Sequence, residues 1–195
     1  MNAFSIFRLG LMFLVLAVSS RSQAEDAGQA DLDKAMEKKL TVESIRDLGE
    51  VIDLCRRAIA GGLDEANKEF AEKLLMGTLV QRAEVICNQI FEQPSPPPQW
   101  PLMQRQALLD LEEAAKIDGE QFDIHFMIGR LNSLPTGDRK RARTAIDKAI
   151  ELAQETPSDH AKALVLRANI ADPSEHRMAD YSEAIKLVPE NAEIV

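Results

Sequence analysis

The strongest constraint on the fold of this chain is a short helical phrase that recurs at a fixed spacing. Three copies align without gaps, at residues 107–117, 142–152 and 177–187, and each begins 35 residues after the one before. A shorter match lies earlier, at residues 51–59. Self-similarity at a fixed period of this length is the signature of a repeat fold.

Small and large apolar residues keep the same places within each copy. A large apolar residue stands three positions before an Ala, and another stands three positions after it, so all three share one helix face. The small side chain lets a neighbouring helix approach closely. The positions expected to pack in this way are Ala58, Ala107, Leu111, Ala114, Ala142, Ile146, Ala149, Tyr181 and Ala184.

The phrase resembles the second helix of a tetratricopeptide repeat, with its small, aromatic and proline positions. In the last copy these are Ala184, Tyr181 and Pro189, and Gly129 after Ile128 matches the Leu-Gly of a first helix. Arg177 departs from the pattern, because the family prefers Ala there. The resemblance implies a right-handed α-solenoid of antiparallel helix pairs with about three to four degenerate repeats. A plain helical bundle with one period is the alternative.

The resemblance divides the chain into successive units. The expected organisation is a signal peptide at 1–24, a disordered stretch at 25–31, and a tetratricopeptide-like domain at 32–195. Within that domain lie a helix unit at 41–63 and repeats at 64–119, 120–157 and 158–195, the last of which could continue.

The first repeat is longer than the others and holds an insertion. One long helix is expected from Glu65 to about Phe91, with an apolar stripe that begins at Phe70 and passes Gly77 without changing face. The proline-rich segment 93–101 follows and is expected to be non-helical, since prolines remove donors and clash with the preceding turn.

The first 24 residues predict export to the periplasm or beyond. Arg8 precedes an apolar run of about ten residues, and small and polar residues lead to Ala24, as in a cleaved signal peptide. The run is too short for a spanning helix, which needs roughly 20 residues. No stable membrane anchor is expected after cleavage.

Composition and motifs argue against several function classes. The chain has 23 basic and 32 acidic residues, a formal charge of −9, which disfavours nucleic acid as a partner. No Gly-rich phosphate loop or metal-ligand spacing occurs, and His125, His160 and His176 lack recognisable partners. We expect no catalytic residues, no metal and no cofactor, and hence no enzyme.

Four residues are candidates for binding a partner. Arg130, Lys162 and Arg167 lie on first helices, whose inner faces bind protein or peptide partners in the resembled family. Trp100, within a polyproline segment, could dock on a partner or fold back into its own repeat.

A basic cluster and a pair of cysteines each allow a structural interpretation as well as a functional one. The basic cluster 139–143 could bind phosphate or acidic groups, or form the solvated start of a helix. Cys55 and Cys87 could pair in an oxidising compartment, but a continuous helix over 65–91 would hold them far apart as buried thiols.

The sequence thus predicts an exported, non-enzymatic scaffold of tetratricopeptide type in the bacterial envelope, whose partner is a protein or peptide that the sequence does not identify. The alternative is the front part of a longer protein whose activity lies in downstream repeats or a catalytic domain, because 189–195 looks like the opening of another repeat. An uncapped repeat end would also make self-association possible.

Overall fold

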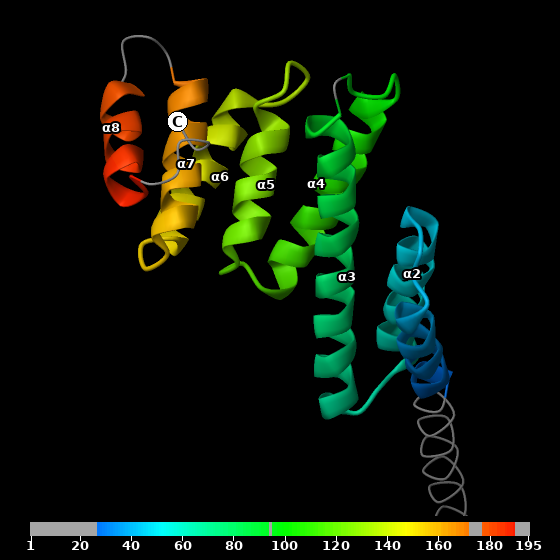
Figure 1. Cartoon of the computed structure of the whole chain (residues 1–195). Helices are drawn as coiled ribbons and strands as arrows, with labels where there is room; N and C mark the ends of the chain where they lie inside the picture. The colour runs from blue at the N-terminus through cyan, green and yellow to red at the C-terminus, as the bar shows by residue number, and fades with distance from the viewer. Residues whose placement is uncertain (1–26, 94, 172–176, 190–195) are drawn as a thin grey trace, which may run out of the picture. The chain divides into compact units, whose positions relative to one another are not determined.

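The computed structural model describes residues 27–93, 95–171 and 177–189, and every regular element in these ranges is a helix (Figure 1). The first helix spans 27–40. The others are α2 (Ile45–Gly61), α3 (Glu65–Phe91), α4 (Trp100–Ile117), α5 (Phe122–Asn132), α6 (Arg139–Leu152), α7 (Pro157–Ile170) and α8 (Arg177–Leu187). The predicted all-α fold class is confirmed. The predicted signal peptide and the residues after 189 lie outside the described ranges.

Contacts within the chain form two compact units that divide inside α3, between Thr78 and Leu79. The first unit contains helix 27–40, α2 and the first half of α3. The second contains the rest of α3 and α4 to α8. Each is described by itself below.

The prediction of disorder at 25–31 is wrong for the described residues, because helix 27–40 begins there. Most residues of this helix are polar because only a narrow face is buried. Leu32 and Ala35 on that face are fully buried. Gly28 lies so close to the end of α2 that an added Cβ would stand 2.0 Å from the carbonyl oxygen of Gly62. Asp31 also pairs with Arg57 of α2, 3.2 Å away. Tertiary contacts therefore stabilise helix 27–40, which the local composition does not predict.

The ends of α2 and α3 follow local capping rules. Ser44 caps α2 by accepting the amide hydrogen of Asp47, which starts the helix at Ile45 rather than near Thr41. Gly62 ends it with a positive φ of 92°, a conformation that glycine adopts at little cost. The Oδ1 of Asp64 then accepts the amide of Asn67, 2.8 Å away, at the start of α3.

The long helix predicted at 65–91 is confirmed: α3 is continuous over 27 residues and passes Gly77 unbroken. Phe70, the first residue of the expected stripe, is exposed. The non-helical segment predicted at 93–101 is two residues too long, because Trp100 and Pro101 form the first turn of α4. Proline is tolerated there, since the first amides of a helix have no intrahelical acceptor.

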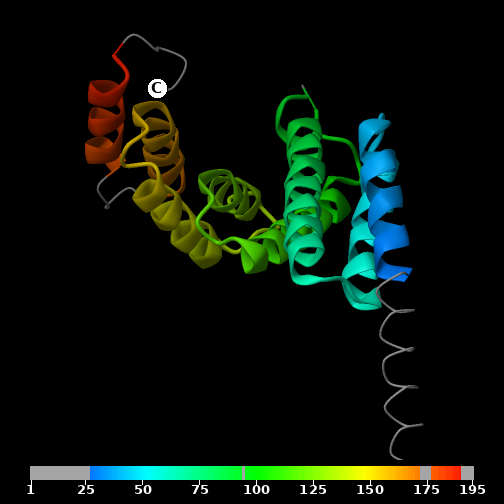
Figure 2. The same cartoon turned by 90° about the horizontal axis from the view of Figure 1, so that it is seen from below.

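In the second unit, consecutive helices form antiparallel hairpins. The pairs α5 with α6 and α7 with α8 pack against each other, and α6 also packs against α7; Figure 1 and Figure 2 show these helices side by side. The repeated small and apolar positions face these contacts. The fully buried ones are Ala107, Leu111, Ala114, Ala142, Ile146, Ala149 and Ala184, and Ala58 is equally buried in the first unit.

Two residues of the last copy differ from what the repeat predicts: Tyr181, which is expected to pack in the core, and Arg177, which departs from the family pattern. Tyr181 is only half-buried, and its hydroxyl donates a hydrogen bond of 2.6 Å to Oδ1 of Asn169. Arg177, which replaces a small residue, donates to the carbonyls of Ala168 and Ala171 at 3.0 and 2.7 Å. A long donor side chain thus satisfies carbonyls at the end of α7 that have no intrahelical partner.

A close helix approach in the second unit occurs at Gly129, where α5 meets α6. A Cβ built on Gly129 would lie 2.5 Å from Cγ1 of Ile146, a fully buried side chain. Gly77 of α3 is the opposite case, since a Cβ there meets nothing within 4 Å.

We therefore expect opposite effects from the same substitution at these glycines. Gly129→Ala should lower the free energy of unfolding by about 1–3 kcal/mol through overpacking. Gly77→Ala should raise it by up to about 1 kcal/mol, because alanine is the better helix former. Urea unfolding of both variants tests this. Equal midpoints would show that α5 and α6 do not approach as closely as described.

No described helix is both long enough and apolar enough to cross a membrane.

Candidate functional site

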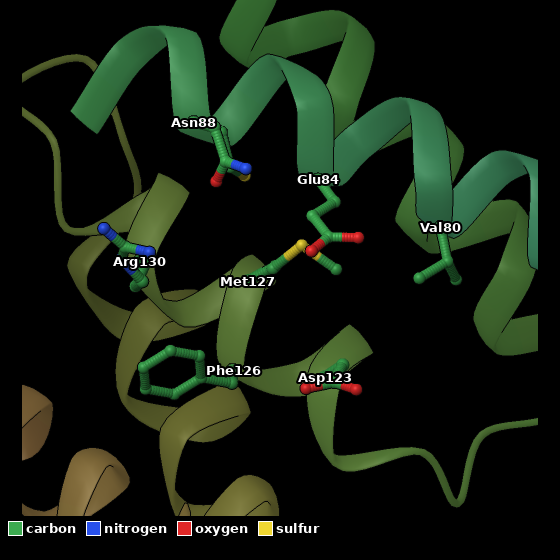
Figure 3. Close-up of a pocket in the computed structure, with 8 residues that line it drawn as sticks. Val80, Glu84, Asn88, Asp123, Phe126, Met127 and Arg130 are labelled. Atoms are coloured by element: carbon green, nitrogen blue, oxygen red, sulfur yellow. The ribbon is translucent and has the colours of Figure 1, made fainter. Parts of the chain in front are cut away.

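A cavity of about 200 Å³ lies between α3 and α5 in the second unit (Figure 3). These are the first helices of consecutive hairpins. One face of each helix lines the cavity, at spacings of three and four residues that repeat along one side of a helix. The lining residues are Val80, Glu84, Cys87 and Asn88 of α3 and Asp123, Phe126, Met127 and Arg130 of α5. We call this the α3/α5 pocket.

Aromatic rings position the single cation of the α3/α5 pocket. The guanidinium carbon of Arg130 lies 4.2 Å from the ring centroid of Phe91 and 6.0 Å from that of Phe126. Phe126 in turn stacks on Phe122, with centroids 5.3 Å apart. Contacts of this kind orient a guanidinium while leaving its hydrogen-bond donors available.

Two carboxylates, Glu84 and Asp123, lie on the other side of the pocket. In Figure 3, Glu84 and Asn88 project from α3 toward α5, while Asp123 lies at the far end of α5 from Arg130. Within the described residues, neither carboxylate forms an ion pair, and Arg130 has none either. The α3/α5 pocket therefore presents both signs of charge without internal compensation.

Both cysteines are buried thiols in the structure. Burial raises the pKa of Cys55 to about 11 and that of Cys87 to about 11. A thiol that keeps its proton near neutral pH is a poor nucleophile and a poor metal ligand. Cys87 therefore contributes packing, rather than reactivity, to the pocket wall.

The residues predicted to bind a partner are not all brought together. Arg130 lies in the α3/α5 pocket, whereas Trp100 is half-buried in the first turn of α4. Lys162 is an exposed residue of α7, and its ammonium lies 2.9 Å from Asp159.

For Arg167 the structure supports a structural role instead. Its Nε and Nη2 donate to the two carboxylate oxygens of Asp180, at 2.9 and 2.7 Å, and its Nη1 donates to Asp147 at 3.1 Å. The bond to Asp180 is the main reason that the pKa of Arg167 is raised. An arginine whose charge is balanced by two carboxylates of neighbouring helices joins those helices, and its charge is not free to attract a partner.

A second buried ion pair, which the sequence did not predict, joins α3 to α4. Arg82 donates Nε and Nη2 to the two oxygens of Asp110, both at 2.7 Å, and Gln106 donates to Asp110 at 2.9 Å. The repeat could have indicated this ion pair, because Asp110 and Asp180 occupy the same position of the phrase, two periods apart.

The repeat did not indicate that Glu84 and Asp123 would line one pocket. The insertion that lengthens α3 breaks the 35-residue period, so the spacing could not show which acidic residues of α3 face the same way as those of α5.

His125 has a structural partner, as does Arg141 of the basic cluster, and His176 lies outside the described residues. Nε2 of His125 lies 2.7 Å from the carbonyl oxygen of Gly119, and Arg141 pairs with Glu112 of α4. His160 stands 35 residues after His125, so these two occupy equivalent repeat positions. Among the described residues, no group of three or more His, Cys, Asp and Glu side chains could hold a metal ion.

Comparison with known proteins finds a similarity to solved structures only. No protein-family model matches the chain, and no curated protein matches it. Among solved structures, it is similar to a thermophilic tetratricopeptide-repeat protein of Thermus thermophilus, at 16% sequence identity and a TM-score of 0.40, over 86% of this chain and 95% of that one. The chain's own helix hairpins, held at close approach by small residues at repeat positions, form a tetratricopeptide-like fold.

Proposed function

We propose that this protein is an exported scaffold that binds a protein or peptide partner in the bacterial envelope through the α3/α5 pocket. The fold suggests a protein-interaction scaffold in general. The observation that carries the specific proposal is the set of unpaired charges in the pocket, Glu84 and Asp123 on one side and Arg130 on the other.

The chemistry of the pocket favours a partner segment that carries a basic side chain. Two carboxylates outnumber one guanidinium in the lining, and the whole chain has a formal charge of −9. Opposite charge steers association and fixes the register of a bound segment. The partner's cation would lie between Glu84 and Asp123, and a carboxylate or backbone carbonyl would accept from Arg130.

Export is supported by the sequence of residues 1–24 alone, with its leading Arg8, apolar run and small residues before the acidic Glu25. Sequencing the N-terminus of protein recovered from the envelope fraction tests export. A chain that begins after Ala24 is the expected result, whereas an intact leader in the cytoplasmic fraction would contradict it.

Site-specific photo-cross-linking in the envelope tests the pocket. With benzoylphenylalanine in place of the exposed Asn88, we expect one saturable cross-linked partner. Glu84→Gln with Asp123→Asn should reduce the cross-linked fraction about tenfold, because two charge contacts are lost.

The matched control is Glu155→Gln with Glu183→Gln, which changes the net charge equally at exposed carboxylates outside the pocket. It should leave the cross-link unchanged. Equal loss of the cross-link in both double variants would show that only the net charge matters. Cross-links confined to a second copy of the chain would show that the pocket mediates self-association, which contradicts the proposal of a separate partner.

A further inference from the structure

A second cavity lies on the opposite side of α5 from the α3/α5 pocket. It measures about 720 Å³ and is lined by His125 and Ile128 of α5 and by Lys140, Arg141, Thr144, Ala145 and Lys148 of α6. We call it the α5/α6 pocket. At about 100° per residue, positions 125 and 128 point away from positions 123, 127 and 130, which line the first cavity. A single short helix thus separates two cavities.

The rim of the α5/α6 pocket is basic, although the chain as a whole is acidic. Lys140, Arg141 and Lys148 contribute three cations, and no carboxylate lines the cavity. Lys140 to Lys148 spans eight residues of α6, or roughly 12 Å along the helix axis. An extended occupant with several negative charges can contact both ends of this rim along the helix.

Two of the three rim cations already form exposed ion pairs, and the third is free among the residues that the structure describes. Arg141 pairs with Glu112, and their side chains are 51% and 37% exposed. Lys140 is exposed and forms no ion pair within the described part of the chain. Lys148 lies 3.1 Å from Glu120 and 3.1 Å from Glu151, but these carboxylates are 72% and 66% exposed. Ion pairs exposed to this degree contribute about 0–1 kcal/mol, so an incoming carboxylate can replace them.

The floor of the pocket is apolar. Ile128 and Ala145 form it, and each retains only a small exposed fraction. An apolar side chain of the occupant would cover the small part of this floor that is still exposed, together with the aliphatic stems of the lining lysines, and so add a modest hydrophobic stabilisation. Nucleic acid has charge but no aliphatic group to place there.

We propose that the α5/α6 pocket is a second docking site, which binds an extended acidic peptide segment with one aliphatic side chain inserted between α5 and α6. The two pockets then select partners of opposite charge on opposite faces of α5. A protein with two such sites can hold two different segments at once, and the second site does not depend on the function proposed for the first.

Fluorescence anisotropy with defined peptides and the full mature chain tests this proposal. The probe is a labelled peptide of Glu residues around a single Leu, and two matched probes carry Gln for Glu or Ser for Leu. We expect saturable binding of the first probe only, weakened by salt because the contacts are electrostatic and exposed. Lys140→Glu should weaken it about fivefold or more, since an attraction becomes a repulsion.

Two control variants distinguish binding at the α5/α6 pocket from a general effect of charge. Lys186→Glu makes the same charge change at an exposed lysine outside both pockets, and should leave the affinity unchanged. Glu84→Gln with Asp123→Asn should also leave it unchanged, whatever that variant does to the partner of the α3/α5 pocket.

Several results would overturn the proposal. Equal binding of the Leu and Ser probes, or displacement by inorganic phosphate at constant ionic strength, would reduce the site to a general anion patch. Stronger binding of a single-stranded oligonucleotide would assign the rim to nucleic acid instead. Equal weakening by Lys140→Glu and Lys186→Glu would leave no role for the α5/α6 pocket.

Discussion

Ala149→Asp is expected to unfold the helix hairpins of the second unit at temperatures where the unchanged protein is folded. Ala149 has no exposed surface, and it lies on α6, which packs against both α5 and α7. The substitution would place a carboxylate at a fully buried position where there is no space for it. Burial of an unpaired charge at a close helix contact should lower the free energy of unfolding by about 4 kcal/mol or more, a large share of the stability of a domain.

Thermal unfolding followed by far-UV circular dichroism measures this effect. Thr144→Asp is the matched control, because it introduces the same charge into the same helix at an exposed position. It should change stability by less than about 0.5 kcal/mol. If both variants melt like the unchanged protein, Ala149 is not a contact residue and the phase assigned to the repeat is wrong.

The helix hairpins could be predicted from the sequence because the repeated residues are the ones that pack between helices. Residues such as Ala114, Ala149 and Ala184 are small because helices meet there, and the constraint recurs with every hairpin, so one sequence contains several copies of the same evidence. Helix 27–40 has no second copy. Its contacts are a close approach of Gly28 to Gly62 and the ion pair of Asp31 with Arg57, neither of which leaves a helical pattern in the sequence.

The candidate sites were harder to predict, because a pocket needs two helices in a known register. Arg130 could be identified from its position on a first helix, but its meeting with Phe91 depends on how far α3 extends past the regular repeat. Glu84 and Asp123 face each other's helix only because of that same extension. The basic cluster was visible in the sequence, whereas the apolar floor beneath it comes from α5 and could not be placed beside it.

One position of the repeat, occupied by Asp110, Ala145 and Asp180 in successive copies, shows how buried charge is accommodated. Asp110 and Asp180 each lie on the second helix of a hairpin, and each receives two bonds from an arginine of the first helix, Arg82 or Arg167. Ala145 occupies the corresponding position of the hairpin between them, which has no such pair. An ion pair and a small side chain are therefore alternative solutions at one packing position, and exchanging them between hairpins should be possible only for both partners together.

Arg82→Met should accordingly be among the most destabilising single changes outside the alanine positions. The side chain of Asp110 is only 1% exposed and that of Arg82 13%, so removing the guanidinium leaves a buried carboxylate with Gln106 as its remaining side-chain donor. Breaking a buried pair from one side costs about 3–5 kcal/mol. Chemical unfolding of the full chain measures the loss.

The double variant Arg82→Met with Asp110→Leu distinguishes a buried charge from lost packing. Replacing both members of a buried ion pair by apolar residues of similar size is often neutral, so the double variant should regain most of the lost stability. Lys73→Met, which breaks an exposed pair with Glu69 on α3, should cost less than about 0.5 kcal/mol. If the double variant is as unstable as Arg82→Met alone, the arginine stabilises α3 against α4 through its aliphatic stem, and the carboxylate at position 110 is not the reason that an arginine stands at position 82.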